Sequence, residues 1–145
     1  MMRQSGLTDA RATLVRPIDG MPDTPTTVDT LKGIIEAFNR HEVDAVMRYF
    51  ADDCTLETPR GPYPYGRRFR GKAAVADAFN ARFHNIPDAR YGDDTHHVHG
   101  DTGVSRWTLR GTSLSGERIE VHGCDFYEFR DGVIVHGDTY WKHVD

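Results

Sequence analysis

An acidic residue inside an apolar stretch is the feature of this sequence most suited to chemistry. The stretch GCDFYEFRDGVIVHGDTYWK, residues 123–142, alternates apolar and polar residues as half-buried strands do, and it contains Asp125. Burial disfavours a charged carboxylate and raises its pKa. A buried Asp125 would therefore be a neutral acid that donates a hydrogen bond to a ligand oxygen. The alternative is a structural aspartate that caps backbone amides or pairs with an arginine.

The face on which Asp125 lies depends on the loop around Asp131-Gly132, because a one-residue slip moves every side chain to the opposite face. A two-residue loop would place Asp125 opposite Asp138, and two like charges that face each other are destabilising. A three-residue loop, with Gly132 in a left-handed conformation, pairs Asp125 with Gly137 and makes one face nearly apolar. We therefore expect the three-residue loop, with Asp125 on the apolar face.

The strand before this hairpin leaves two interpretations of Asp125 open. A three-residue loop over residues 114–116 would place Trp107 on the same apolar face as Asp125. A two-residue loop would place Arg106 opposite Asp125, and the resulting ion pair would lower the pKa of the acid. The apolar pattern favours the first register.

Helices and a sheet must position these residues. Apolar residues at helical spacing predict a first helix from Thr26 or Thr27 to about Phe38, a short second helix near residues 43–50 and a third over about 72–83. Alternating stretches between turn residues predict strands over about 54–58, 95–99, 104–112, 119–129 and 133–141. Helices followed by a run of antiparallel strands indicate an α+β fold, in which one curved sheet packs against the helices.

Length and composition are those of an ordinary globular domain. The 145 residues suggest one domain over residues 26–145, preceded by a tail over residues 1–25 that prolines and glycines interrupt. The formal net charge of −4 argues against a nucleic-acid partner, and no apolar stretch of membrane-spanning length is present, so that no membrane partner is expected. Because the N-terminus has no apolar core of the secretory type, the expected location is cytoplasmic.

The histidines are the other candidate functional residues. On a strand, His97 and His99 share a face while His96 points away, and two histidines without a third ligand do not define a metal site. Spacing places no phosphate-binding loop, dinucleotide fingerprint or catalytic triad. We therefore expect neither a metal nor a cofactor. His122 and His136 fall on the outer, convex face of the predicted sheet, where a dimer interface is their most natural use.

Three segments together resemble a known superfamily. They are AFNRHEVDAVMRYFADDCTLETPRG (37–61), FRGKAAVADAF (69–79) and GCDFYEFRDGVIVHGDTYW (123–141). In content and order they are similar to the nuclear transport factor two-like superfamily, above all to its SnoaL-like polyketide cyclases and ketosteroid isomerases. The resemblance covers about residues 27–145. It implies a cone-shaped roll, in which a curved, mainly antiparallel sheet wraps around three N-terminal helices and an apolar pocket, and dimerisation through the convex side of the sheet.

The resemblance also implies roles for single residues. Asp125 falls where ketosteroid isomerase keeps a protonated aspartic acid in its oxyanion hole, and where the SnoaL-like cyclases carry an acid–base aspartate. Trp141 matches an active-site tryptophan of the isomerase, while Ser113 replaces a histidine of the cyclases. The catalytic base and the three tyrosines of the isomerase fall on residues of other types, namely Thr58, Ile34, Phe50 and Phe79. Steroid isomerisation by that mechanism is therefore not expected.

Residues and resemblance together predict a small-molecule-binding domain. Asp125 is the candidate catalytic residue of a cofactor-independent isomerase or cyclase that acts on an apolar carbonyl compound. The alternative is a non-catalytic ligand-binding or dimerisation module of the same fold. The predicted partners are a small apolar molecule and a second copy of the chain. The predicted pocket is lined by Thr58, Trp107, Tyr127, Trp141, Ile34, Phe38, Phe50, Phe79 and Tyr63.

Overall fold

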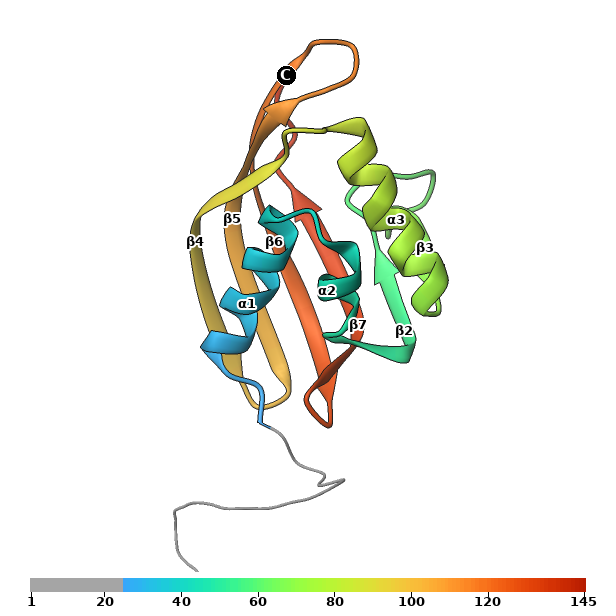
Figure 1. Cartoon of the computed structure of the whole chain (residues 1–145), viewed down its shortest axis with the longest axis vertical. Coiled ribbons are helices and arrows are strands. Elements are labelled where there is room, and N and C mark those ends of the chain that lie inside the picture. The colour runs from blue at the N-terminus through green and yellow to red at the C-terminus, as the bar shows by residue number, and fades with distance from the viewer. Residues whose placement is uncertain (1–24) are drawn as a thin grey trace, which may run out of the picture.

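The computed structural model describes residues 25–145, so that the expected tail lies, apart from its last residue, outside the described residues. Three helices lie on one face of a six-stranded sheet (Figure 1). The helices are α1 (Val28–Asn39), α2 (Val43–Met47) and α3 (Lys72–Asn85). The strands are β2 (Phe50–Glu57), β3 (Arg68–Arg70), β4 (Arg90–His99), β5 (Thr102–Thr112), β6 (Arg118–Arg130) and β7 (Val133–Trp141). None of the helices over residues 25–145 is long and apolar enough to cross a membrane.

The sheet order is β3-β2-β7-β6-β5-β4, and every pair is antiparallel except β2 with β7. This arrangement confirms the predicted α+β roll with a mainly antiparallel sheet. Three strands differ from the prediction. β2 begins at Phe50 rather than near residue 54, so that the second helix ends earlier than expected, at Met47. β4 begins at Arg90 rather than Thr95, and β3 lies where no strand was predicted.

The first helix forms where the spacing predicts it. Thr27 caps it, because its hydroxyl accepts a hydrogen bond from the backbone N–H of Thr30 at 3.2 Å while the Thr30 hydroxyl accepts one from the backbone N–H of Thr27. Its apolar stripe is buried against the sheet and includes Leu31, Ile34 and Phe38. Burial of this stripe supplies most of the free energy that keeps so short a helix folded.

The hairpin between β6 and β7 has a shorter loop than expected. Arg130 pairs with Val133, so that Asp131 and Gly132 form a two-residue loop with φ values of 53° and 82°. Positive φ at both central positions is typical of a type I′ turn, for which Asp-Gly is a favoured pair. The predicted three-residue loop was therefore wrong.

A bulge corrects the register of the same hairpin. Val135 is an extra residue, because the pairing jumps from Phe129–Ile134 to Glu128–His136. The expected pairing of Asp125 with Gly137 was wrong, and Asp125 lies opposite Thr139 instead. The bulge nevertheless puts Gly137, Thr139 and Trp141 of β7 on the expected inner face. Asp125 is buried on the same face of the sheet, with only 6% of its surface exposed.

The preceding hairpin has the favoured register. Ser113 and Glu117 close the three-residue loop over residues 114–116, with the Ser113 N–H donating to the Glu117 carbonyl at 2.9 Å. Ser105 therefore lies opposite Asp125, whereas Arg106 lies opposite Cys124 on the outer face. The alternative in which Arg106 pairs with Asp125 is excluded by this register.

Aromatic side chains occupy much of the space between the helices and the sheet. Phe38 of α1 meets Phe79 of α3 edge to face, with ring centroids 5.1 Å apart. Phe79 in turn contacts Phe50 at 5.6 Å, and Tyr91 of β4 contacts Trp107 of β5 at 4.9 Å. All of these rings belong to one buried cluster. The interior of the roll is therefore densely packed around the buried acid.

Candidate functional site

Asp125 is held by two neutral donors on neighbouring strands. The indole N–H of Trp107 on β5 donates to Oδ2 at 2.9 Å, and the hydroxyl of Thr139 on β7 donates to Oδ1 at 2.6 Å. Both partners are buried with it. The central position of β6 in the sheet, between β5 and β7, brings these side chains together from residues 18 and 14 positions away.

The surroundings of Asp125 favour its neutral form. Burial raises the pKa of the Asp125 carboxyl above its usual value, and this effect outweighs the lowering by Thr139, Trp107, Arg82 and Tyr127. Burial, reinforced by the neighbouring Asp125, also raises the pKa of Tyr127 well above its usual value. Two buried groups that resist ionisation thus lie side by side on the inner face.

A guanidinium from α3 lies near this acid without clamping it. Arg82 donates from Nη1 to the hydroxyl of Tyr91 at 2.9 Å, and its guanidinium carbon lies 5.2 Å from the centre of the Trp141 ring. Over residues 25–145, no ion pair joins Arg82 to Asp125. Burial lowers the pKa of Arg82, but the Tyr91 hydroxyl and Asp125 together outweigh it and keep the guanidinium charged.

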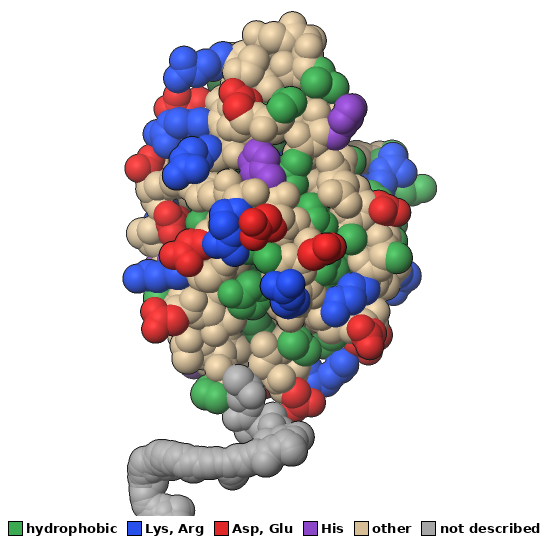
Figure 2. Space-filling model, viewed as in Figure 1, with side chains coloured by type: hydrophobic (Ala, Val, Ile, Leu, Met, Phe, Trp, Pro, Cys, Tyr) green, Lys and Arg blue, Asp and Glu red, His purple; other side chains and the backbone are tan. Residues whose placement is uncertain are grey.

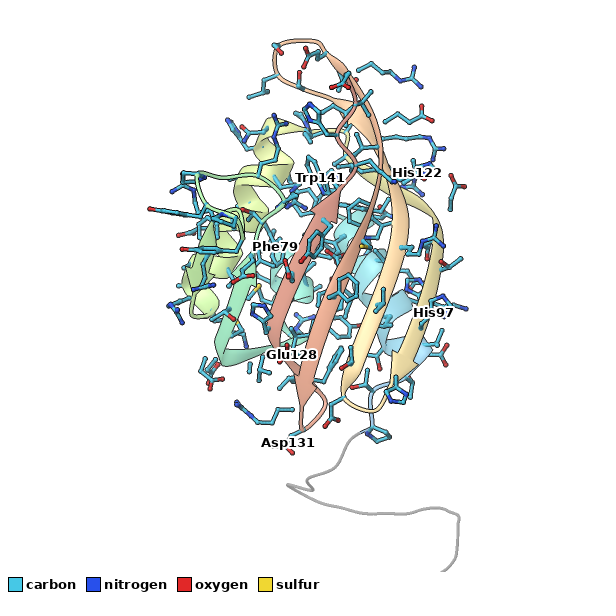
Figure 3. All side chains as sticks on the ribbon, turned by 180° about the vertical axis from the view of Figure 1, so that it is seen from behind. Phe79, His97, His122, Glu128, Asp131 and Trp141 are labelled. Atoms are coloured by element: carbon cyan, nitrogen blue, oxygen red, sulfur yellow. The ribbon has the colours of Figure 1, made fainter. Side chains whose placement is uncertain are left out.

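A pocket of about 240 Å³ opens beside Arg82 and Trp141. We call it the open-end pocket; its walls come from α3, from the segment around β3 and from the end of β7. It is lined by Thr58, Pro59, Arg60, Arg67, Phe69, Ala78, Ala81, Arg82, Asn85 and Trp141. Figure 3 shows Trp141 at the end of β7, on the side of the sheet where α3 lies. Asp125 does not line the pocket; its partner Thr139 is two residues from the pocket residue Trp141 on β7.

The structure divides the predicted pocket residues into three groups. Thr58 and Trp141 line the open-end pocket. Tyr63 is exposed and stacks on Tyr65, with ring centroids 5.3 Å apart. The others are packed in the core around Asp125, and they are Ile34, Phe38, Phe50, Phe79, Trp107 and Tyr127.

Sequence reasoning missed His96, a half-buried residue whose side chain is buried on the inner face. Ring nitrogen Nδ1 of His96 lies 2.8 Å from the Ser105 hydroxyl, and Nε2 lies 2.6 Å from Oδ2 of Asp94. Since Ser105 lies opposite Asp125, these residues extend a polar row across β4, β5, β6 and β7. The alternation along β4 could have revealed this residue, because it places His96 on the opposite face from His97 and His99.

The linked Asp94, His96 and Ser105 have the residue types of a nucleophile–base–acid set. Ser105 is only 1% exposed, however, and lines none of the pockets described over residues 25–145. The arrangement therefore supports a structural role, in which His96 satisfies the buried Ser105 hydroxyl under α1.

The metal-compatible group in the described part of the chain lies on the other face of the sheet. Ligand atoms of Glu57, His136 and Asp138 lie within 4.8 Å of one another, and this group includes neither His97 nor His99. Arg68 already pairs with Glu57, with Nε 2.7 Å from Oε2. Burial and the nearby Glu57 raise the pKa of the Asp138 carboxyl. Arg68 thus already neutralises part of the negative charge that would attract a metal cation to this group.

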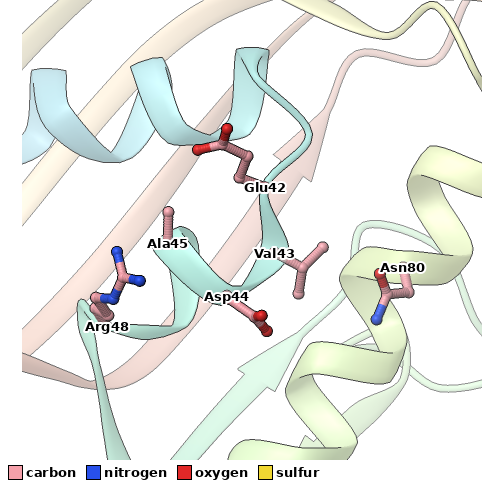
Figure 4. A pocket seen from close by; sticks show the side chains of 6 residues that line it. All are labelled: Glu42, Val43, Asp44, Ala45, Arg48 and Asn80. Atoms are coloured by element: carbon pink, nitrogen blue, oxygen red, sulfur yellow. The ribbon is translucent and has the colours of Figure 1, made fainter.

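Other hollows lie outside the open-end pocket, and two of them reach the partners of Asp125. One of about 270 Å³ is lined in part by Thr139, and one of about 300 Å³ in part by Trp107. A groove of about 440 Å³ between α2 and α3 is lined by Glu42, Val43, Asp44, Ala45, Arg48 and Asn80 (Figure 4). Its charged side chains of both signs match the mixed charges over this face in Figure 2. On the convex face, Phe126 and Tyr140 are exposed and meet edge to face at 5.8 Å. His122 lies on this face as well (Figure 3), and a homodimer through it stays a prediction.

Comparison with known proteins identifies the family. Residues 31–137 match the model of the SnoaL-like domain, and the chain therefore belongs to the SnoaL-like family. This is the class of fold expected from the resemblance, a type that binds small molecules. No curated protein matches significantly.

Solved structures share the fold. A candidate polyketide cyclase from Xanthomonas campestris pv. campestris is 22% identical with a TM-score of 0.70, over 79% of this chain and 88% of the other. An NTF2-like protein of unknown function from Burkholderia pseudomallei is 25% identical with a TM-score of 0.69 over the same shares. TerC, co-crystallised with polyporic acid, is 17% identical with a TM-score of 0.69, over 79% and 90%.

Proposed function

We propose that this SnoaL-like domain binds a small, mostly apolar, oxygen-bearing molecule in the open-end pocket, with Asp125 as the acid of a cofactor-independent isomerase or cyclase. The observation that carries the proposal is a buried carboxyl whose partner Thr139 lies two residues along β7 from the pocket residue Trp141. Burial raises the pKa of this carboxyl. The fold similarity to a candidate polyketide cyclase and to TerC, which was crystallised with polyporic acid, supports the choice of ligand class.

The proposed chemistry is proton transfer next to a carbonyl group. A neutral Asp125 can donate a hydrogen bond to the oxygen of an enol or enolate and so stabilise the charge that develops there. Contact between Asp125 and a ligand in the pocket requires intervening side chains to shift, because Asp125 is buried and does not line the pocket. Thr58 does not supply a base, since an alcohol hydroxyl does not ionise near neutral pH; it donates to the backbone carbonyl of Arg60 at 2.9 Å.

A second candidate is binding without catalysis. It is favoured by the two hydrogen bonds that occupy both oxygens of Asp125, one from Trp107 and one from Thr139. In this case Asp125 would hold the inner face of the sheet together, and the pocket alone would carry the function.

A thermal-shift screen with phenols, steroids and polyketide-like lactones tests the binding proposal. We expect ligands that raise the Tm of the natural protein, and we expect Trp141→Ala to abolish that rise because it removes a pocket wall. Tyr140→Ala is the matched control, since Tyr140 is the next residue but lies exposed on the convex face. No stabilising ligand, or equal stabilisation of the Trp141→Ala variant, would contradict binding in this pocket.

The variant Asp125→Asn distinguishes the two candidate functions. For an enzyme, this variant keeps ligand affinity and loses turnover, because the amide has no proton to transfer to the ligand. If the variant keeps both affinity and turnover, Asp125 has no catalytic role and the binding function alone remains.

A further inference from the structure

We propose that the open-end pocket selects an apolar acid, a molecule whose carboxylate is held by Arg82 and the indole N–H of Trp141, over its neutral analogue. The inference rests on the proposed function in that it needs the pocket to bind a small molecule. It adds the charge of the ligand and the residues that recognise it.

The first observation is the charge of the pocket. Arg60, Arg67 and Arg82 line it, and no Asp or Glu does. None of the three makes an ion pair among the described residues, whereas Arg68, in the same segment, pairs with Glu57. Three positive charges therefore gather around one small pocket in a chain whose formal net charge is −4. Such a site favours an anion.

The second observation is an unsatisfied donor. The indole nitrogen of Trp141 is buried and has no hydrogen-bond partner in the part of the chain that the structure describes. An indole nitrogen is only a donor, and a buried donor without an acceptor costs about 1–3 kcal/mol. Because Trp141 lines the pocket, a ligand oxygen could supply the missing acceptor.

The third observation is the pairing of these two groups. The Arg82 guanidinium lies over the Trp141 ring with its carbon 5.2 Å from the ring centre. Arg82 uses Nη1 for the Tyr91 hydroxyl, and its remaining N–H groups have no acceptor among the described residues. A guanidinium has five N–H donors, and its planar fork matches the two oxygens of a carboxylate. One carboxylate could thus accept from Arg82 and from Trp141 together.

The remaining pocket walls indicate the polarity and size of the rest of the ligand. Phe69, Ala78, Ala81 and the Trp141 ring are apolar and suit a flat hydrocarbon body. The volume of about 240 Å³ is below the usual range of about 300–1,000 Å³ for small-molecule pockets. The ligand class is therefore a compact aromatic or alicyclic carboxylic acid of about one or two rings.

A matched pair of probes tests this selectivity directly. Isothermal titration calorimetry with 2-naphthoate and 2-naphthamide compares a carboxylate with a neutral molecule of nearly the same shape. We expect the acid to bind about tenfold more tightly or better, because hydrogen bonds to charged groups are the stronger ones. We also expect added salt to weaken the acid more than the amide.

Variants identify the groups responsible. Arg82→Lys keeps the charge and loses the planar fork, and Arg67→Ala removes an exposed charge without touching the core; each is expected to reduce the preference for the acid. Arg48→Ala is the control, because Arg48 is an exposed arginine at the separate groove between α2 and α3. Circular dichroism confirms that each variant is folded, which matters for Arg82 because it also holds Tyr91.

The outcomes distinguish the inference from the function on which it rests. Equal affinity for acid and amide, or a preference unchanged in both Arg82→Lys and Arg67→Ala, overturns the inference and leaves the binding function standing. If neither probe binds and the thermal-shift screen also finds no ligand, both are overturned.

Discussion

Trp107 donates its indole N–H to Asp125 at 2.9 Å, across two neighbouring strands and in the buried interior of the roll. The partner of this acid is thus a neutral donor rather than a guanidinium. A neutral donor stabilises the carboxylate less than an ion pair would, so that burial dominates and the pKa of Asp125 is raised. The same geometry carries four predictions about stability.

Replacing Asp125 by Asn should change how stability depends on pH. The folded-state pKa of Asp125 lies above the unfolded value of 3.8. Its contribution to stability is therefore complete below the unfolded pKa and is lost as pH rises through the folded pKa. Asn does not titrate, so the free energy of unfolding of Asp125→Asn should rise relative to the natural protein over that pH window. Urea denaturation between pH 4 and pH 8 measures this difference.

Asp53→Asn is a control with the opposite sign. Arg130 holds the pKa of the Asp53 carboxyl below its usual value, through an exposed ion pair at 2.9 Å. Its small contribution is present above the unfolded pKa and is lost as pH falls through the folded pKa. A pH-independent difference for Asp125→Asn, or one with the same sign as for Asp53→Asn, would show that Asp125 is charged in the folded protein.

Replacing Trp107 by Phe should destabilise the protein and raise the pKa of Asp125 further. The change removes the N–H that lowers this pKa and leaves Oδ2 without its donor, at a cost of about 1–3 kcal/mol. Trp141→Phe is the comparison, because the Trp141 indole nitrogen has no partner within residues 25–145. Chemical denaturation should give the larger loss for Trp107→Phe; equal losses would mean that this hydrogen bond contributes nothing.

A methyl group at Gly123 should disturb the same contact by sterics. A Cβ there would lie 2.4 Å from Cη2 of Trp107 and 2.6 Å from the backbone oxygen of Tyr140, closer than atoms can pack, so that the indole and the neighbouring strand must move. Gly123→Ala should therefore cost about 1–3 kcal/mol and shift the Trp107 fluorescence. At Gly92 a Cβ would meet nothing nearer than 3.7 Å, and Gly92→Ala should be nearly neutral in the same assays. Similar effects of the two changes would argue against the packing described for Trp107.

The polar row beyond Asp125 should also matter for stability. Ser105→Ala leaves Nδ1 of the buried His96 without its partner and should cost about 1–3 kcal/mol in the free energy of unfolding. His97→Ala is the matched control, because His97 is exposed on the opposite face of β4 (Figure 3). If thermal unfolding shows no difference between the two variants, the His96–Ser105 contact is not a structural one.

The inner face of β6 could be predicted from sequence, while its loop could not. The predicted register put Asp125 on the apolar face of β6 with Val121 and Phe129, and the structure buries Asp125 on that face. Val133, Ile134 and Val135 are all apolar, so that the alternation gives no sign of the bulge at Val135. A two-residue loop with a bulge and a three-residue loop without one bury the same residues of β6.

The start of β4 and the contacts of Arg82 could not be predicted from the sequence for other reasons. Asp93 adopts a positive φ of 54°, and the register shift beside it interrupts the alternation that would have revealed the start of β4. Arg82 reaches Tyr91 and Trp141 only because α3 packs across the sheet, and the last turn of a helix gives no local signal of such a contact. Pairings of this kind depend on tertiary packing, not on local pattern.

The most direct test measures the protonation state of Asp125. Carbon-13 NMR can follow the aspartate carboxyl groups as the pH is raised from 3 to 9. One resonance, absent from the spectrum of Asp125→Asn, should keep the chemical shift of a neutral acid above the pH at which the exposed aspartates have ionised. If that resonance titrates with the exposed aspartates or below them, Asp125 is an ordinary carboxylate and cannot serve as the proposed acid.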